Sequence, residues 1–124
     1  MRARFVWATL PVVLSFACGA SFPVPTQRMA DAESAHRSAV ELGAANQPAA
    51  QLHVKLAEEQ MTIAKARITD GDNMGADSLL IRSKADSELA LALAREQNSS
   101  VEAQKAAEQA NNTTTTNAVQ GAVR

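Results

Sequence analysis

The chain has 124 residues, 12 of them lysine or arginine and 13 aspartate or glutamate, so its formal net charge is −1. This balance lacks the excess of cations that supports nucleic-acid binding, because that affinity comes from phosphate neutralisation. Aromatic residues make up 3% of the chain, which counts against a deep ligand pocket. The single cysteine excludes an intramolecular disulfide.

The first 17 residues have the pattern of a secretory signal peptide. Arg2 and Arg4 give a basic start, and the run from Phe5 to Ala17 contains no charged residue. This run is shorter than the roughly 20 residues that a membrane-spanning helix needs, and Pro11 interrupts it. We therefore predict a signal peptide over residues 1–17. The alternative is a buried N-terminal helix of a cytosolic protein.

The only cysteine, Cys18, stands where the apolar run ends. Residues 14–19, Leu-Ser-Phe-Ala-Cys-Gly, resemble the lipobox of bacterial lipoproteins, although the two residues before Ala17 depart from the usual motif. The resemblance implies cleavage between Ala17 and Cys18 and lipidation of Cys18, with two or three acyl chains that anchor the protein stably to a membrane. The alternative is ordinary signal-peptidase cleavage after Ala17 or Ala20.

Residues 18–26 are predicted to form a tether, because Pro23 and Pro25 prevent a helix from extending backwards. Thr26 is expected to cap the first helix through its hydroxyl. That helix is predicted over residues 27 to 42, where apolar positions recur at steps of three and four. Gly43 is expected to end it, because glycine adopts positive φ at little cost.

A second helix is predicted from Pro48 to about residue 70, since proline suits the first turn of a helix. Its apolar residues fall on two stripes, one of them Ala50, Val54, Ala57, Met61, Ala64 and Ile68, the other Leu52, Leu56, Ile63 and Ala66. A helix with one apolar stripe covers one neighbour. Two stripes therefore predict that the second helix is central and is covered on both sides.

A turn is predicted after the second helix. Gly71 is expected to end that helix, and Asp72 or Asn73 to cap the next one. The aspartates of this turn have some likeness to a calcium-binding loop. Met74 and Ile81 occupy positions of that loop where oxygen ligands are needed, so a capped turn is the better interpretation.

The third helix is predicted to start near Met74, with a core stripe at Ile81, Ala85, Leu89 and Ala92. Ser99 followed by Glu102 has the spacing of a capping box, so the helix either restarts there or continues to residue 110. Residues 111–124 are polar and of low complexity, and we expect them to be disordered.

Together these elements predict an all-α fold over residues 27–110. The expected architecture is an antiparallel helical hairpin plus a shorter N-terminal helix, with tetratricopeptide-like or coiled-coil-like packing. A long coiled-coil oligomer is the alternative fold. The turns at residues 43–48 and 70–73 argue against one continuous rod.

Residues 10–110 resemble small Ala-rich bacterial envelope lipoproteins of the domain of unknown function 4398 family. The likeness rests on the lipobox-like start, Leu42-Gly43-Ala44, Pro48, the Asp70-Gly71 turn and the Ala-rich stretch 87–94. The resemblance implies a lipid-anchored protein without catalytic residues. Because Gly19 is not aspartate, it also implies the periplasmic face of the outer membrane rather than the inner membrane.

No arrangement of residues indicates catalysis. His36 and His53 lie 17 positions apart without a ligand pattern, and we interpret them as surface or boundary residues. Phosphate loops and nucleophile or zinc-protease motifs are missing from the sequence. We therefore expect a protein that is not an enzyme and has no metal, cofactor, small-molecule substrate or nucleic-acid partner.

Two functions follow as alternatives. The first is a lipid-anchored structural or interaction module that contacts another envelope protein or peptidoglycan. The second is a soluble helical binding protein in the periplasm or outside the cell, released by ordinary signal-peptidase cleavage.

Overall fold

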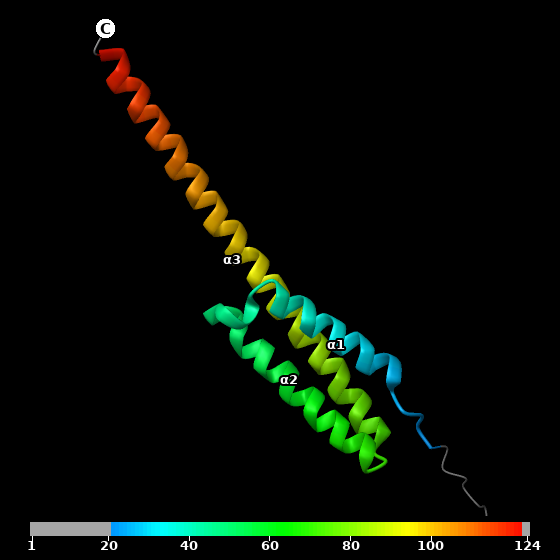
Figure 1. Ribbon diagram of the computed structural model, residues 1–124. Coiled ribbons are helices and arrows are strands. Elements are labelled where there is room, and N and C mark those ends of the chain that lie inside the picture. Colours follow the sequence, from blue (N-terminus) through cyan, green and yellow to red (C-terminus); the bar gives the residue numbers. More distant parts are fainter. Residues whose placement is uncertain (1–20, 123–124) are drawn as a thin grey trace, which may run out of the picture.

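The computed structural model describes residues 21–122, so the predicted signal peptide and Cys18 lie outside the described residues. Within that range the chain forms helix α1 (Thr26–Glu41), a short 3-10 helix η1 (Ala44–Asn46), helix α2 (Pro48–Thr69) and helix α3 (Asn73–Ala122). The described residues contain helices and no strand, which confirms the predicted all-α class. Helices α2 and α3 form a hairpin, α1 lies along it, and α3 continues far beyond both (Figure 1).

The boundaries of α1 and α2 and the start of α3 fall close to the predicted ones because local chemistry decides them. Gly43 and Gly71 have φ of 86° and 81°, the left-handed conformation that glycine adopts most readily. Pro48 begins α2, as predicted. The prediction for Thr26 is wrong, since it is the first helical residue and not the cap. Pro25 is the N-cap residue, and its carbonyl accepts the N–H of Met29 at 3.0 Å. The first turn of α1 therefore has no side-chain cap.

Asp72 caps the start of α3, which confirms one of the two predicted alternatives. Its Oδ1 accepts the backbone N–H of Gly75 at 2.9 Å, and its Oδ2 contacts the guanidinium of Arg67. The hydrogen bond from Gly75, followed by that from Arg67, holds the pKa of Asp72 below its usual value. The ionised carboxylate is therefore the form that stabilises this turn.

Acid is expected to weaken the turn through Asp72. Because its folded-state pKa is depressed, its contribution is complete above the ordinary value of 3.8 and is lost as pH falls through the lower folded-state pKa. In Asp72→Asn the cap is kept but the titrating group is removed. We expect the urea midpoint of the wild type, followed by circular dichroism, to fall more between about pH 5 and pH 2 than that of Asp72→Asn. Parallel pH profiles would contradict this assignment.

The core consists mainly of alanine, so the helix backbones approach closely. Ser83 Oγ donates to the carbonyl of Ala57 across the hairpin, and Ser87 Oγ donates to the carbonyl of Ser83, both at 2.8 Å. Leu80 is the largest fully buried side chain. The buried residues of α3 are Ala76, Leu80, Ser83, Ser87, Ala90 and Ala94, which recur at steps of four and three. This stripe faces both other helices, since α1 and α2 each make most of their interhelical contacts with α3.

Two predicted stripes are therefore not core. On α3, Ile81 and Leu89 are 46% and 44% exposed, and on α2, Leu52 and Ile63 are 60% and 41% exposed. The prediction that α2 is the central helix is also wrong, because α3 lies between the other two. The physical reason is that small residues, with the Ser83 hydroxyl bonded inside the hairpin, permit closer packing than the larger side chains do.

The prediction of a disordered tail is a further correction. Helix α3 runs without a break past Ser99 to residue 122, a length of 50 residues. Extending an existing helix adds one backbone hydrogen bond per residue, so propagation is easier than nucleation. Three threonine hydroxyls also donate to carbonyls four residues earlier, each at 2.9 Å: Thr113, Thr114 and Thr115.

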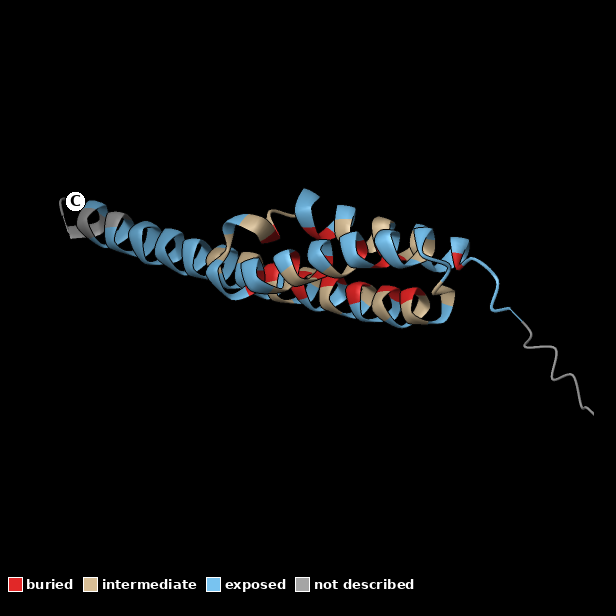
Figure 2. Ribbon diagram, turned by 90° about the horizontal axis from the view of Figure 1, so that it is seen from below, coloured by how far each residue is buried: buried red, intermediate tan, exposed pale blue. Residues whose placement is uncertain are grey.

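Residues 99–122 of α3 are called the arm here. The buried residues lie where the three helices face one another, and the arm is almost wholly exposed where its side chains are described (Figure 2). Residues 123 and 124 of the predicted tail lie outside the described residues.

Candidate functional site

The predicted lipidation and cleavage residues, Cys18 and Ala17, lie outside the described residues, which begin at Ser21. Asn73 Nδ2 donates to the carbonyl of Phe22 at 2.7 Å. This bond fixes the described part of the tether beside the turn between α2 and α3. The tether therefore meets the bundle at one end, and the arm leaves from the other (Figure 1).

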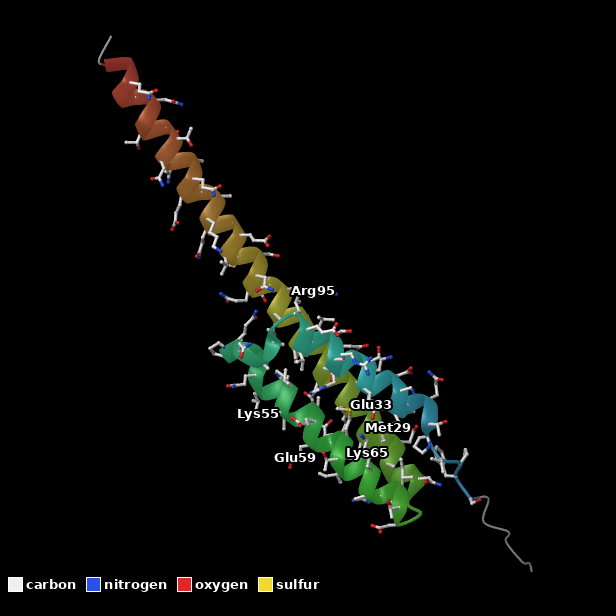
Figure 3. The ribbon with its side chains drawn as sticks, in the orientation of Figure 1. Met29, Glu33, Lys55, Glu59, Lys65 and Arg95 are labelled. Carbon is white, nitrogen blue, oxygen red and sulfur yellow. The ribbon has the colours of Figure 1, made fainter. Side chains whose placement is uncertain are left out.

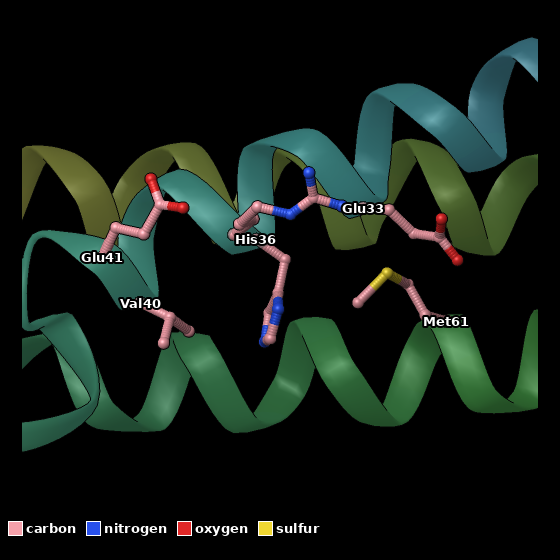
Figure 4. Close-up of a pocket in the computed structure, with 6 residues that line it drawn as sticks. Glu33, His36, Val40, Glu41 and Met61 are labelled. Carbon is pink, nitrogen blue, oxygen red and sulfur yellow. The ribbon is translucent and has the colours of Figure 1, made fainter.

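A groove of about 330 Å³ lies between α1 and α2. Its lining comes from one face of α1 and one residue of α2: Glu33, His36, Arg37, Val40, Glu41 and Met61 (Figure 4). His36 Nε2 is buried and has no hydrogen-bond partner. Neither serine nor cysteine lines the groove, so it contains no pair of nucleophile and base.

His53 lies elsewhere, between α2 and α3. Its Nδ1 is 2.9 Å from Asp86 Oδ1, and Gln60 Nε2 donates to Asp86 Oδ2 at 2.8 Å. These three residues form a polar cluster, which we call the clasp, that ties the two helices of the hairpin. The structure thus keeps the two histidines in separate environments. Both are partly buried, as expected for boundary residues.

Ion pairs tie α1 to one side of the hairpin only. Lys65 Nζ lies 3.0 Å from Glu33 Oε1, and Arg28 Nε donates to Asp77 Oδ1 at 3.1 Å. Figure 3 shows Glu33 and Lys65 between α1 and α2, whereas Lys55 projects from α2 away from α1. The other side of the hairpin is therefore left without a covering helix.

We call this uncovered side the open face. The three clasp residues lie on this face, with His53 and Gln60 on α2 and Asp86 on α3. From His53 and from Asp86 the face continues along each helix at steps of three and four residues. Its residues are His53, Leu56, Gln60 and Ile63 on α2, with Leu52 beside them, and Arg82, Asp86, Leu89 and Leu93 on α3. Leu52, Leu56 and Ile63 belong to the second predicted stripe of α2, and the structure shows that no helix covers this stripe.

No group of three or more histidine, cysteine or acidic side chains in residues 21–122 is arranged to hold a metal ion. Among the helices described here, none is long and apolar enough to cross a membrane.

The described residues define an all-helical protein, a three-helix bundle with one helix extended into an arm. No protein-family model matches the chain, and no curated protein or solved structure is significantly similar to it.

Proposed function

We propose that the protein is an exported bacterial lipoprotein whose helical domain is a non-catalytic structural or protein-interaction module of the cell envelope. The observation that carries this proposal is Cys18, the only cysteine, at the junction between a basic-apolar leader and a proline-containing tether. The resemblance to Ala-rich envelope lipoproteins of the domain of unknown function 4398 family supports the same reading. Gly19 favours the periplasmic face of the outer membrane.

The shape of the domain suits this role. The tether meets the bundle beside the α2–α3 turn, and the arm projects from the opposite end (Figure 1). A helix of 50 residues is about 75 Å long at 1.5 Å per residue. A lipid at Cys18 holds one end of this rod, and the hairpin and the arm are then available to another envelope protein or to peptidoglycan. The regular four-three spacing of the α3 core favours coiled-coil-like packing of the hairpin.

A second candidate is a soluble helical binding protein released by ordinary signal-peptidase cleavage. The observation that favours it is the groove between α1 and α2, where His36 Nε2 has no hydrogen-bond partner. The groove has no aromatic lining residue, and aromatic side chains usually dominate small-molecule sites. We therefore favour the lipoprotein.

Labelling with a fatty acid distinguishes the two candidates. Cells that express the wild type, Cys18→Ser and the control Ser21→Ala are grown with a labelled fatty acid and fractionated. We expect label and membrane association for the wild type and for Ser21→Ala, and loss of both in Cys18→Ser, because one thiol carries the anchor. An unlabelled wild type in the soluble fraction would reject the lipoprotein and favour the second candidate.

A further inference from the structure

No other helix of the described residues covers the arm or the open face. Every arm side chain described from residue 102 to residue 115 is exposed. Most helical stability in proteins comes from tertiary packing and not from intrinsic propensity. On the open face, Leu52, Ile63 and Leu89 are 60%, 41% and 44% exposed. Large apolar side chains gathered on one surface mark an interaction site.

One face of the arm carries small side chains that complement the larger leucine and isoleucine side chains of the open face. Its members are small: Ala103, Ala107, Ala110, Thr114 and Ala118. They recur at steps of three and four and so share one side of the helix. The charged residues of the arm, Glu102, Lys105 and Glu108, fall outside this small face. A helix that presents alanine to leucine and isoleucine can approach closely, because large side chains then fill the space left by small ones.

The spacing along the two helices also agrees. Leu52 and Ile63 are eleven residues apart on α2, and Ala107 and Ala118 are eleven residues apart on the arm. If the arm lies parallel to α2, both exposed apolar side chains of α2 meet alanine. The arm then runs antiparallel to the α3 segment of the hairpin.

A chain cannot place its own arm on its own open face. The arm continues α3 in one uninterrupted helix and points away from the bundle (Figures 1 and 2). A second copy can supply the arm without any change of backbone. We propose that two copies exchange arms, so that the arm of each lies on the open face of the other as a fourth helix.

The area that the arms can cover favours a second copy as the occupant of the open face. An arm of 24 residues is about 36 Å long and 10 Å wide, so two reciprocal contacts remove roughly 1,400 Å² from water. Stable interfaces bury about 1,200–2,000 Å².

Disulfide trapping in the full-length chain tests the exchange, which does not depend on the proposed lipid anchor. The double variant Leu52→Cys with Ala107→Cys is expected to give a covalent dimer after mild oxidation in intact cells. The matched control, Leu52→Cys with Lys105→Cys, places the second thiol on the far side of the arm and is expected to stay monomeric. The unaltered chain shows whether Cys18 forms a disulfide between two copies. The single-cysteine variants show whether the same introduced cysteine of two copies forms one.

Light scattering of the purified full-length chain provides the second readout. We expect the mass of a dimer for the wild type and of a monomer for Ala107→Arg, whose exposed position leaves the bundle core intact. A monomeric wild type would overturn the proposal. Equal crosslinking of both cysteine pairs, or a dimer in which neither pair crosslinks, would overturn the assigned interface.

Discussion

Replacing Leu80 by alanine is expected to lower the free energy of unfolding by about 2–5 kcal/mol, the range for truncating a large core side chain. Leu80 is fully buried and lies in the cluster that joins all three helices, with Ala32 of α1 and Met61 and Ala64 of α2. Because its neighbours are mostly small and lie on rigid helices, little can move to fill the cavity. Small domains have a total stability of about 5–15 kcal/mol, so this loss is severe.

Urea unfolding followed by circular dichroism measures the effect of Leu80→Ala. The matched control is Ile81→Ala on the same helix, which removes the same number of carbon atoms from a side chain that is 46% exposed and lies outside the open face. For an exposed position we expect a change of no more than about 0.5 kcal/mol. A small effect at Leu80 together with a large one at Ile81 would mean that the buried stripe of α3 has been assigned to the wrong side of the helix.

Ala57→Leu is expected to be the second most damaging change, because it adds volume where the hairpin is closest. Ala57 is fully buried, and its carbonyl accepts the Ser83 hydroxyl at 2.8 Å. Overpacking costs about 1–3 kcal/mol. Separating the helices also breaks a buried hydrogen bond worth about 0.5–1.5 kcal/mol. The thermal midpoint is expected to fall clearly.

The control for Ala57→Leu is Ala66→Leu, nine residues further along the same helix at an exposed position. Leucine and alanine have similar helix propensities, so this variant is expected to melt close to the wild type. Tolerance of leucine at residue 57 would contradict close packing of α2 against α3.

Local chemistry made the helix ends predictable from the sequence. Glycines with positive φ end α1 and α2, and a proline at the first helical position starts α2. Each of these signals depends on one or two neighbouring residues. The helix ends that these residues cause can therefore be predicted without knowledge of the tertiary structure.

Which side of α3 is buried depends on tertiary packing and could not be predicted from the sequence. Helix α3 offers two stripes, one with Ile81 and Leu89, the other with Ser83 and Ser87. Apolarity alone favours the first, yet the second is buried, because the Ser83 hydroxyl finds an acceptor on α2 and Ser87 finds one on its own helix. A serine that is satisfied by a distant carbonyl cannot be recognised from periodicity.

The clasp was missed for a related reason. His53 and Asp86 are 33 positions apart, and their contact depends on how the hairpin is aligned. The helical structure of residues 111–122 was not predicted, because their polar composition indicates only that they cannot form a hydrophobic core. It does not show that a helix which begins in a stable bundle can continue through them. The small face of the arm was visible in the sequence as alanines, but its relation to the open face appears only in three dimensions.

The central claim is that Cys18 becomes the lipidated first residue of the mature protein. Intact-mass analysis of the protein extracted from membranes tests this claim most directly. The predicted result is a chain that begins at Cys18 and carries the added mass of two or three acyl chains, together with a Cys18→Ser variant that lacks this mass. A mature chain without acyl mass, whether it begins at Cys18 or at Ser21, would contradict the claim.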